Sequence, residues 1–256
     1  MAPKFFDGFC GGLMNVFKKL YRNYGKSMPK FLKQPLLKWY YKLFKTVHCV
    51  KCNVSWERAS FVYKNESLCL FDYVRHSSLE LVAREIHENK IAGNVAELGV
   101  FQGHFAQYIN KIFPDKKLYL FDTFEGFNEN EVEIEKNLQK FVPSSGIFSH
   151  TCIDIVLSKM KYKQNCIIKK GFFPETAKDL NDTFAFVSID VDLSEPIYNG
   201  LCWFYPRLEK GGYIFVHDYN DKTWTGANVG VKKFSSDYKI PYFPLSDHSG
   251  SVIFMK

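Results

Sequence analysis

The chain has 256 residues, of which 46% are hydrophobic and 17% aromatic, so its composition excludes wholesale disorder and suits one α/β domain with an extension. The formal net charge of +7 is uneven, because residues 1–45 hold ten Lys or Arg and one acid, whereas the rest of the chain is slightly acidic. No apolar run reaches the roughly 18 residues that span a bilayer, and seven irregularly spaced cysteines indicate reduced thiols, so we predict a cytoplasmic protein.

Residues 1–71 are predicted to form a basic, aromatic and partly helical extension. Pro29 and Pro35 divide its amphipathic pattern into short helical pieces. Such helices pack on the domain or on a second subunit, or they contact an anionic membrane face or a negatively charged substrate carrier. The second alternative places the protein peripherally at the inner membrane face. The Cys49-x-x-Cys52 pair has no second pair near it, so we expect no zinc site there.

Residues 72–256 are predicted to form the functional domain. Its first element is an amphipathic helix over Asp72–Asn89, with Ser77 or Ser78 as the expected N-cap. This helix delivers the chain to a short apolar run, Val95–Leu98, which is typical of a buried strand.

A strand, a glycine turn, a helix and a second strand are predicted to follow one another here. The helix is expected over His104–Phe113 and the second strand over Leu118–Phe121. This unit is typical of the first half of a doubly wound sheet, whose ligand lies outside the carboxyl ends of the strands.

Acids and glycines surround the first turn of that unit. Gly99 and Gly103 allow the backbone to approach a ligand, but the three-glycine pattern that holds a pyrophosphate is absent. Glu97 suits a cationic ligand, and Asp122 is placed to accept hydrogen bonds from ribose hydroxyls. Together these residues favour S-adenosylmethionine over a dinucleotide, although each acid alone is equally typical of a strand end.

The remaining elements complete an α/β sheet of about seven strands with a C-terminal antiparallel hairpin. The charged residues 128–140 are expected to form a surface lid. The predicted elements are helices at Thr151–Met160 and Leu193–Leu208, strands at Asn165–Lys169, Phe184–Ile189 and Tyr213–Val216, and a hairpin from Pro241–Pro244 and Ser251–Met255.

Polar residues follow the fourth and fifth predicted strands. Asp190 and Asp192 follow the fourth strand, and His217 and Asp218 follow the fifth. Carboxylates with an imidazole hold a divalent cation such as Mg²⁺, which lowers the pKa of a bound hydroxyl so that a carboxylate or histidine removes its proton. The alternative is that Asp190 and Asp218 only cap the helices that follow.

The chain leaves the third predicted strand at Gly171. Phe172 or Phe173 then either flanks an adenine ring at the edge of the sheet or belongs to the hydrophobic core.

Five motifs in order resemble those of the macrocin O-methyltransferase family, which methylates sugar hydroxyls. The resemblance runs from about Asp72 to the C-terminus and does not cover the basic extension. The motifs are A-E-L-G-V-F-Q-G-H-F (96–105), L-F-D-T-F-E-G-F (120–127), G-F-F-P-E-T (171–176), S-I-D-V-D-L (188–193) and F-Y-P-R-L-E-K-G-G-Y-I-F-V-H-D-Y (204–219).

The resemblance implies a class I, Rossmann-like methyltransferase fold, S-adenosylmethionine as donor, and Mg²⁺ between aspartates of the fourth and fifth strands. Asp190 and Asp218 match two of those aspartates, whereas His217 stands where the family has a third. Histidine there favours Mn²⁺ or another metal, or leaves His217 to act as the base. The predicted catalytic residues are Asp190 and His217, the predicted metal ligands are Asp190, His217 and Asp218, and the predicted cofactor-binding residues are Glu97, Gly99, Gly103, Asp122, Thr123, Phe124, Gly171 and Phe172.

The leading hypothesis is an S-adenosylmethionine-dependent, metal-assisted O-methyltransferase acting on a sugar hydroxyl of a glycan, a glycan precursor or a glycosylated metabolite. The alternatives are a catechol-type small-molecule O-methyltransferase and a catalytically inactive, membrane-associated adaptor. The acidic body and the lack of a recognisable binding module predict no nucleic-acid partner. The resemblance also implies a homo-oligomer.

Overall fold

The computed structural model describes residues 72–127, 129–136, 146–221 and 225–256. Asp72–Lys256 forms one compact unit. The predictions made for residues 1–71, including the basic helices and the Cys49-x-x-Cys52 pair, lie outside the described residues.

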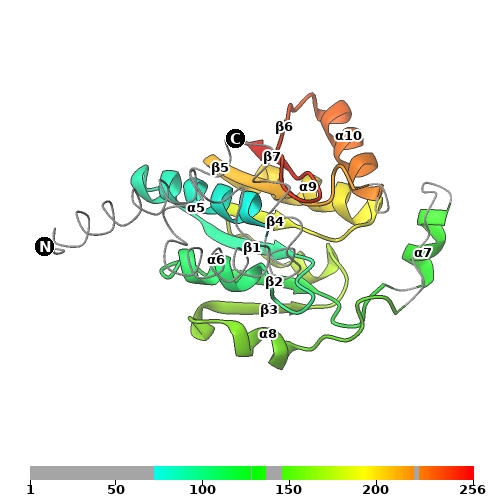
Figure 1. Cartoon of the computed structure of the whole chain (residues 1–256), viewed down its shortest axis with the longest axis horizontal. Coiled ribbons are helices and arrows are strands. Elements are labelled where there is room, and N and C mark those ends of the chain that lie inside the picture. Colours follow the sequence, from blue (N-terminus) through cyan, green and yellow to red (C-terminus); the bar gives the residue numbers. More distant parts are fainter. Residues whose placement is uncertain (1–71, 128, 137–145, 222–224) are drawn as a thin grey trace, which may run out of the picture. The chain divides into compact units, whose positions relative to one another are not determined.

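A seven-stranded sheet runs through the middle of this unit in the order β3-β2-β1-β4-β5-β7-β6 (Figure 1). The first five strands are parallel, and β7 pairs antiparallel with both β5 and β6. The predicted doubly wound sheet with a closing hairpin is therefore confirmed. The strands are β1 (Asn94–Leu98), β2 (Leu118–Asp122), β3 (Cys166–Lys170), β4 (Phe184–Ile189), β5 (Leu208–Val216), β6 (Phe243–Pro244) and β7 (Val252–Met255).

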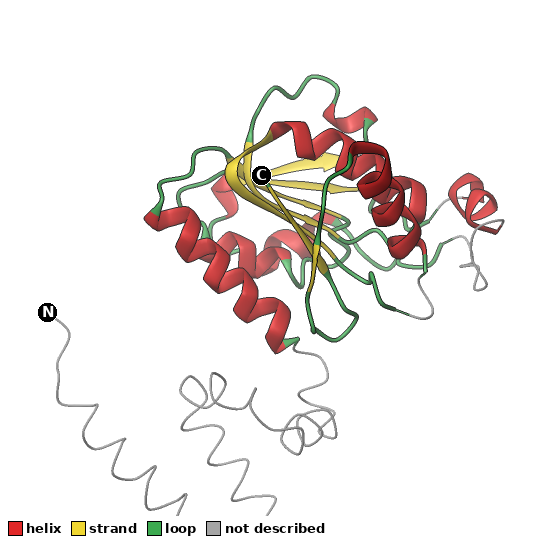
Figure 2. Ribbon diagram, turned by 90° about the horizontal axis from the view of Figure 1, so that it is seen from above, coloured by secondary structure: helices red, strands yellow, loops and turns green. Residues whose placement is uncertain are grey.

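Helices cover both faces of the sheet (Figure 2). Side chains of α5, α6 and α8 pack in one apolar cluster with one face, and those of α9 and α10 pack in a second cluster with the other face. The helices are α5 (Tyr73–Glu88), α6 (Ala106–Ile112), α7 (Glu129–Lys136), α8 (Ile153–Lys159), α9 (Ser194–Arg207) and α10 (Gly226–Tyr238), with single turns η1 (Lys163–Asn165) and η2 (Glu175–Ala177).

The central strand β4 explains how the site is placed. All six of its residues are buried, because its side chains enter both clusters, Phe186 on one face and Val187 on the other. Burial on both faces fixes the register of β4 between β1 and β5. The carboxyl ends of these strands therefore meet at one edge of the sheet.

Three local predictions differ from the structure. Helix α5 begins earlier than its expected serine caps, because the Asp72 side chain accepts a hydrogen bond from the Arg75 N–H and caps it. Residues 129–136, inside the segment predicted to be a surface lid, form helix α7, which sequence analysis did not predict. Sequence analysis predicts no element at α10, which packs against α9.

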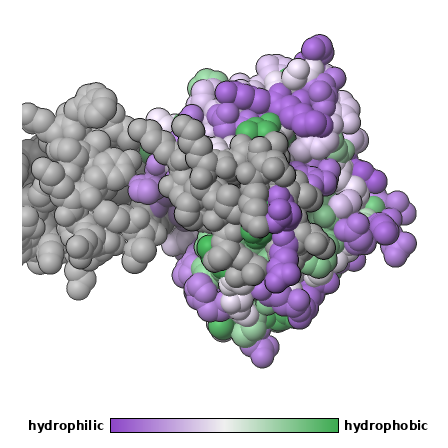
Figure 3. Space-filling view, turned by 90° about the vertical axis from the view of Figure 1, so that its right-hand side faces the viewer, coloured by the Kyte–Doolittle hydropathy of each residue, from purple (hydrophilic) through white to green (hydrophobic). Residues whose placement is uncertain are grey.

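The described surface in Figure 3 is mostly hydrophilic, with apolar residues in small groups. Within the described ranges, no helix combines the length and the apolar character that crossing a bilayer requires.

Candidate active site

A cavity of about 430 Å³ lies at the carboxyl edge of the sheet. It is lined by residues that follow β1, β2, β3, β4 and β5, as the doubly wound topology requires. Of the eleven predicted site residues, nine line it: Glu97, Gly99, Asp122, Thr123, Gly171, Phe172, Asp190, His217 and Asp218.

The other two predicted residues, Gly103 and Phe124, do not line the cavity. Gly103 packs beside Val156 of α8. Phe124 is 7% exposed and belongs to the apolar cluster under α5 and α6, but its backbone N–H donates to Asp122. Both residues thus support the shape of the turn from outside the cavity.

Glu97 is a buried acid with an unused oxygen. It is 1% exposed, accepts a hydrogen bond from the backbone of Ala106, and has no partner at Oε2. Burial raises the pKa of Glu97 well above its ordinary value, although Arg75 opposes the shift. A buried acceptor in the cavity wall is suited to a ligand that brings a positively charged donor.

Asp122 organises the turn after β1. Its Oδ2 accepts hydrogen bonds from the N–H groups of Val100 at 2.7 Å and Phe101 at 2.8 Å, and its Oδ1 accepts one from Phe124 at 2.7 Å. A carboxylate has about four acceptor positions, so these bonds leave capacity for one further donor from the cavity.

Both phenylalanines after Gly171 line the cavity, but Phe173 also packs against the hydrophobic core. The Phe173 ring stacks on Phe204 at 5.4 Å and packs edge-on against Phe121. Phe172 is 44% exposed and lines the cavity, so it is the ring available to a bound planar group.

Asp190 lies between two cationic side chains. Its Oδ2 accepts a hydrogen bond from Arg75 at 3.0 Å, and its Oδ1 lies 3.3 Å from Nδ1 of His217. The same Nδ1 lies 3.0 Å from Oδ1 of Asp218. Arg75 is 6% exposed, also donates to Ser188, and stacks over an aromatic ring of the β1–α6 turn.

These contacts shift the protonation of the cluster. Burial alone would lower the pKa of His217, but the charge of Asp190 and the hydrogen bonds that His217 donates to both aspartates raise it to about 10. Burial raises the pKa of Asp190, but His217 and Arg75 outweigh it and hold that pKa below its ordinary value. Burial and the neighbouring acids raise the pKa of Asp192 well above its ordinary value.

The three predicted metal ligands lie close enough to hold an ion, since one ligand atom from each lies within 4.8 Å of the others, but in this arrangement their charges and hydrogen bonds are satisfied without one. Asp190 and Asp218 are already matched by the positive charges of His217 and Arg75, and Nδ1 of His217 is a donor to both carboxylates. An ion among them would need that nitrogen without its proton. The replacement of an acid by His217 supplies positive charge where the family resemblance places a metal.

Replacement of His217 by asparagine is expected to reduce stability in a pH-dependent way. Because the folded pKa of about 10 exceeds the ordinary value of 6.5, protonated His217 stabilises the fold fully below about pH 6.5. That contribution is lost as the pH rises through about 10. Thermal unfolding in chelator should show a difference in unfolding temperature between wild type and His217→Asn that narrows over this range. A difference that stays constant would contradict the ion pair.

Helix α7 reaches the segment that follows Asp190. The carboxylate of Glu135 accepts hydrogen bonds from the backbone N–H of Ser194 and, at 3.0 Å, from its hydroxyl. Ser194 is the first residue of α9, so Glu135 caps that helix from a distant part of the chain. The charged segment is therefore tied to the loop that carries Asp190.

Several residues of the site were not predicted from the sequence. Arg75 carried a signal, because it shares the apolar stripe of α5 with Leu79 and Ile86. A charged residue on a buried stripe needs a partner, and here the partner is Asp190. The cavity-lining rings of Phe101, Phe127 and Phe148 had no comparable signal, since they meet only through loops.

A family model described as macrocin-O-methyltransferase (TylF) matches residues 67–253. No curated protein sequence matches the chain.

Solved structures of two methyltransferases are similar to the chain. The O-methyltransferase NovP shares 16% sequence identity at a TM-score of 0.58, over 72% of this chain and 80% of NovP. The calicheamicin methyltransferase CalS11 shares 17% identity at a TM-score of 0.58, over 89% of this chain and 94% of CalS11. An apo structure of CalS11, described as TDP-rhamnose 3'-O-methyltransferase, matches at a TM-score of 0.51 and 17% identity, over 81% of this chain and 91% of that chain. At these identities the likeness establishes the class I methyltransferase fold.

Proposed function

The chain belongs to the macrocin O-methyltransferase family, and we propose that it transfers the methyl group of S-adenosylmethionine to a hydroxyl of a sugar. The observation that carries this proposal is the single cavity with an unpartnered Glu97 oxygen in its wall and the Asp190–His217 pair beside it. The Glu97 oxygen suits the cationic amino acid part of the donor, and the Asp190–His217 pair suits a hydroxyl that must lose a proton.

The donor is proposed to lie along β1 and β2. Glu97 accepts a hydrogen bond from the ammonium group of the methionine part, and Asp122 accepts one from the ribose. Phe172 flanks the adenine ring. These roles follow the free acceptor atoms and the exposed ring of the cavity wall.

The acceptor hydroxyl is proposed to approach Asp190. The hydroxyl oxygen attacks the methyl carbon, the carbon–sulfur bond breaks with its electrons staying on sulfur, and Asp190 takes the hydroxyl proton. The oxygen becomes strongly acidic as its bond to carbon forms, so a carboxylate of low basicity suffices. Arg75 and His217 hold Asp190 in place from its two oxygens. No step of this sequence passes through a metal ion.

Labelled S-adenosylmethionine tests the reaction against a panel of acceptors. Because the structural neighbour CalS11 is described as a TDP-rhamnose 3'-O-methyltransferase, nucleotide-linked sugars are the first class to try. Free sugars and catechols complete the panel. We expect label on a sugar oxygen. Label on catechols alone would favour the small-molecule alternative.

Glutamine at position 97 is expected to weaken S-adenosylmethionine binding by about 10- to 100-fold, because a charged hydrogen bond is lost. The pKa of Glu97 is raised in the fold, so its ionised form costs stability increasingly as the pH rises above its ordinary value of 4.5. Glu97→Gln should therefore be at least as stable as wild type near neutral pH without cofactor. Calorimetric binding and thermal unfolding check both parts, with the exposed Glu80→Gln as control. Unchanged binding would remove Glu97 from the cofactor site.

The basic extension is proposed to hold a negatively charged carrier of the acceptor, at a membrane surface or on a nucleotide. The support is its sequence alone, since it lies outside the described residues. Replacing Lys38, Lys42 and Lys45 with glutamine should weaken binding of the anionic acceptor and leave S-adenosylmethionine binding unchanged. Equal acceptor affinity in both proteins would end this suggestion.

A further inference from the structure

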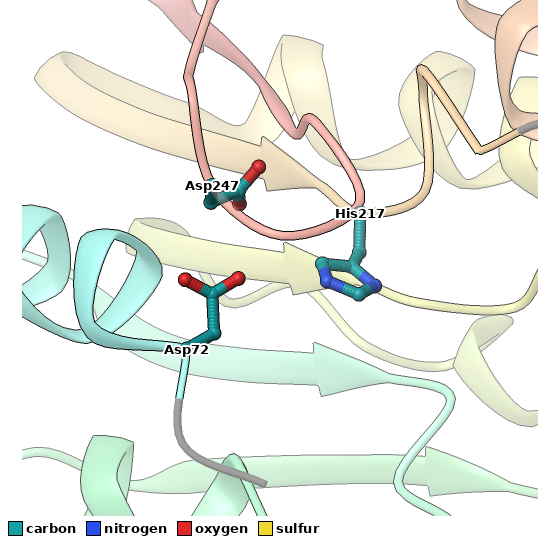
Figure 4. Close-up of side chains that lie close together, drawn as sticks. All are labelled: Asp72, His217 and Asp247. Atoms are coloured by element: carbon teal, nitrogen blue, oxygen red, sulfur yellow. The ribbon is translucent and has the colours of Figure 1, made fainter. Parts of the chain in front are cut away.

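The side chains of Asp72, Asp247 and His217 lie close together (Figure 4). They come from the start of α5, the loop between β6 and β7, and the end of β5. Neither Asp72 nor Asp247 lines the catalytic cavity. We propose that these three residues form a divalent-cation site, separate from the cavity and joined to it through the His217 ring.

Asp247 supplies the observation that points to a ligand. It is 8% exposed, and its Oδ1 accepts a hydrogen bond from the backbone N–H of Ser251 at 2.5 Å. Its Oδ2 is buried and has no partner. A buried carboxylate oxygen without a donor is costly, and a cation would satisfy it.

Asp72 is held in place by the backbone. Its Oδ1 accepts a hydrogen bond from the N–H of Arg75 at 3.1 Å, and its Oδ2 accepts one from the N–H of His248 at 2.9 Å. These bonds tie the start of α5 to the loop that carries Asp247. Within the described part of the chain, no lysine or arginine forms an ion pair with either carboxylate.

His217 is oriented as a metal-binding histidine usually is. Its Nδ1 is engaged by the carboxylates of Asp190 and Asp218 at 3.3 and 3.0 Å. Figure 4 shows a nitrogen-bearing edge of the ring turned toward Asp72. A histidine that donates one N–H to a carboxylate presents its other nitrogen to a metal in a fixed direction. The ion would take the place of the proton on that second nitrogen.

The spacing of the three side chains suits an ion. One ligand atom from each lies within 4.8 Å of the others, and none of the three pairs forms a direct hydrogen bond or ion pair. Metal–ligand bonds of about 2.1 to 2.4 Å allow separations up to roughly twice that length, so small side-chain shifts close the site. Two oxygens and one imidazole nitrogen favour Mn²⁺ or Zn²⁺ over Mg²⁺.

The family resemblance places an acid where this chain has His217. The proposal gives that histidine a role as a ligand of the outer cation, instead of a weak ligand beside Asp190 and Asp218. The ion lies outside the cavity. It polarises the imidazole ring, which strengthens the hydrogen bond that Nδ1 donates to Asp190. The substrate then meets Asp190 and His217 without meeting the metal.

Mn²⁺ binding to the full chain, stripped with chelator, tests the proposal. Calorimetry should show one Mn²⁺ per chain in the wild type, and Asp247→Asn should weaken binding at least about tenfold, since each 1.4 kcal/mol is tenfold. The matched variant Asp218→Asn, which removes charge from the inner cluster, should weaken it less. Asp247→Asn keeps the acceptor for Ser251, and its unfolding temperature without Mn²⁺ checks that it folds.

Crystals of the wild type grown with Mn²⁺ locate the ion independently through anomalous scattering. A peak between Asp72, Asp247 and His217 is the expected result. No binding at millimolar Mn²⁺, a peak between Asp190 and Asp218, or a loss of affinity in Asp218→Asn but not in Asp247→Asn would each overturn the proposal. Because none of these readouts needs an acceptor, a failure here is distinct from a failure of the proposed methyl transfer.

Discussion

Asparagine in place of Asp190 is expected to lower kcat by about 10²- to 10⁴-fold, the range for loss of a positioned proton acceptor. The amide still offers an oxygen to Arg75, but its NH2 group cannot accept from Nδ1 of His217, which keeps Asp218 as its acceptor. S-adenosylmethionine affinity should change little, because the proposed donor contacts lie on β1 and β2. Single-turnover rates and calorimetric binding on the same preparation separate the two effects.

The control for this substitution is Asp237→Asn. Asp237 is an exposed residue of α10 that pairs with Lys233, and it lies outside the cavity. It should leave both rate and binding unchanged. If Asp190→Asn keeps more than about a tenth of wild-type kcat, Asp190 is not the group that takes the proton, since general-base loss costs more.

Alanine in place of Gly99 is expected to destroy the site. Gly99 has φ of +84°, and a Cβ there would lie 2.0 Å from the carbonyl oxygen and 2.6 Å from the carbonyl carbon of Asp190. The carbonyl belongs to the backbone, so the ends of β1 and β4 must separate. We expect a loss of roughly 4 kcal/mol or more in unfolding free energy, together with loss of S-adenosylmethionine binding.

Gly146→Ala separates the clash from the backbone strain. Gly146 has φ of +80° and nothing within 4 Å of a Cβ, so its substitution costs only the left-handed conformation, about 1 to 2 kcal/mol. Denaturant unfolding of both variants checks the difference. If both variants lost the same unfolding free energy, the clash between a Cβ at position 99 and the Asp190 carbonyl would not be the reason that the turn needs glycine.

Most of the sheet could be predicted because its signals are local. The run Phe184–Ile189 is apolar except for Ser188 and matches the bounds of β4, since a strand covered on both faces is apolar at nearly every position. The location of acids at strand ends could also be predicted, because parallel strands have their carboxyl ends at the same edge of the sheet. Asp122, Asp190 and Asp218 were found in this way and line one cavity.

Helix α10 could not be predicted, because its local preferences oppose it. Gly226, Gly230 and two valines lower its helix propensity. Gly230 is nevertheless needed there, since a Cβ would lie 2.6 Å from the carbonyl oxygen of Ser194 on α9. The buried residues Ala227, Gly230, Val231 and Phe234 do follow a helical spacing, but a glycine adds no apolar side chain to that pattern, so the signal is weak.

The two acids of the proposed cation site, Asp72 and Asp247, could not be predicted from the sequence for a different reason. Asp72 and Asp247 are 175 residues apart in the sequence and meet only when α5 and the β6–β7 loop are both in place. The spacing of acids along the sequence does not predict that these two side chains lie close together. The family resemblance pointed to Asp190, His217 and Asp218. The grouping of Asp72 and Asp247 with His217 could be recognised only in the folded structure.

The most direct test of this account is a crystal structure of the full chain with S-adenosylhomocysteine. The account predicts its ammonium group on Glu97, its ribose on Asp122, and its sulfur directed toward Asp190 and His217. A product bound elsewhere on the protein, or one whose sulfur points away from Asp190, would contradict it.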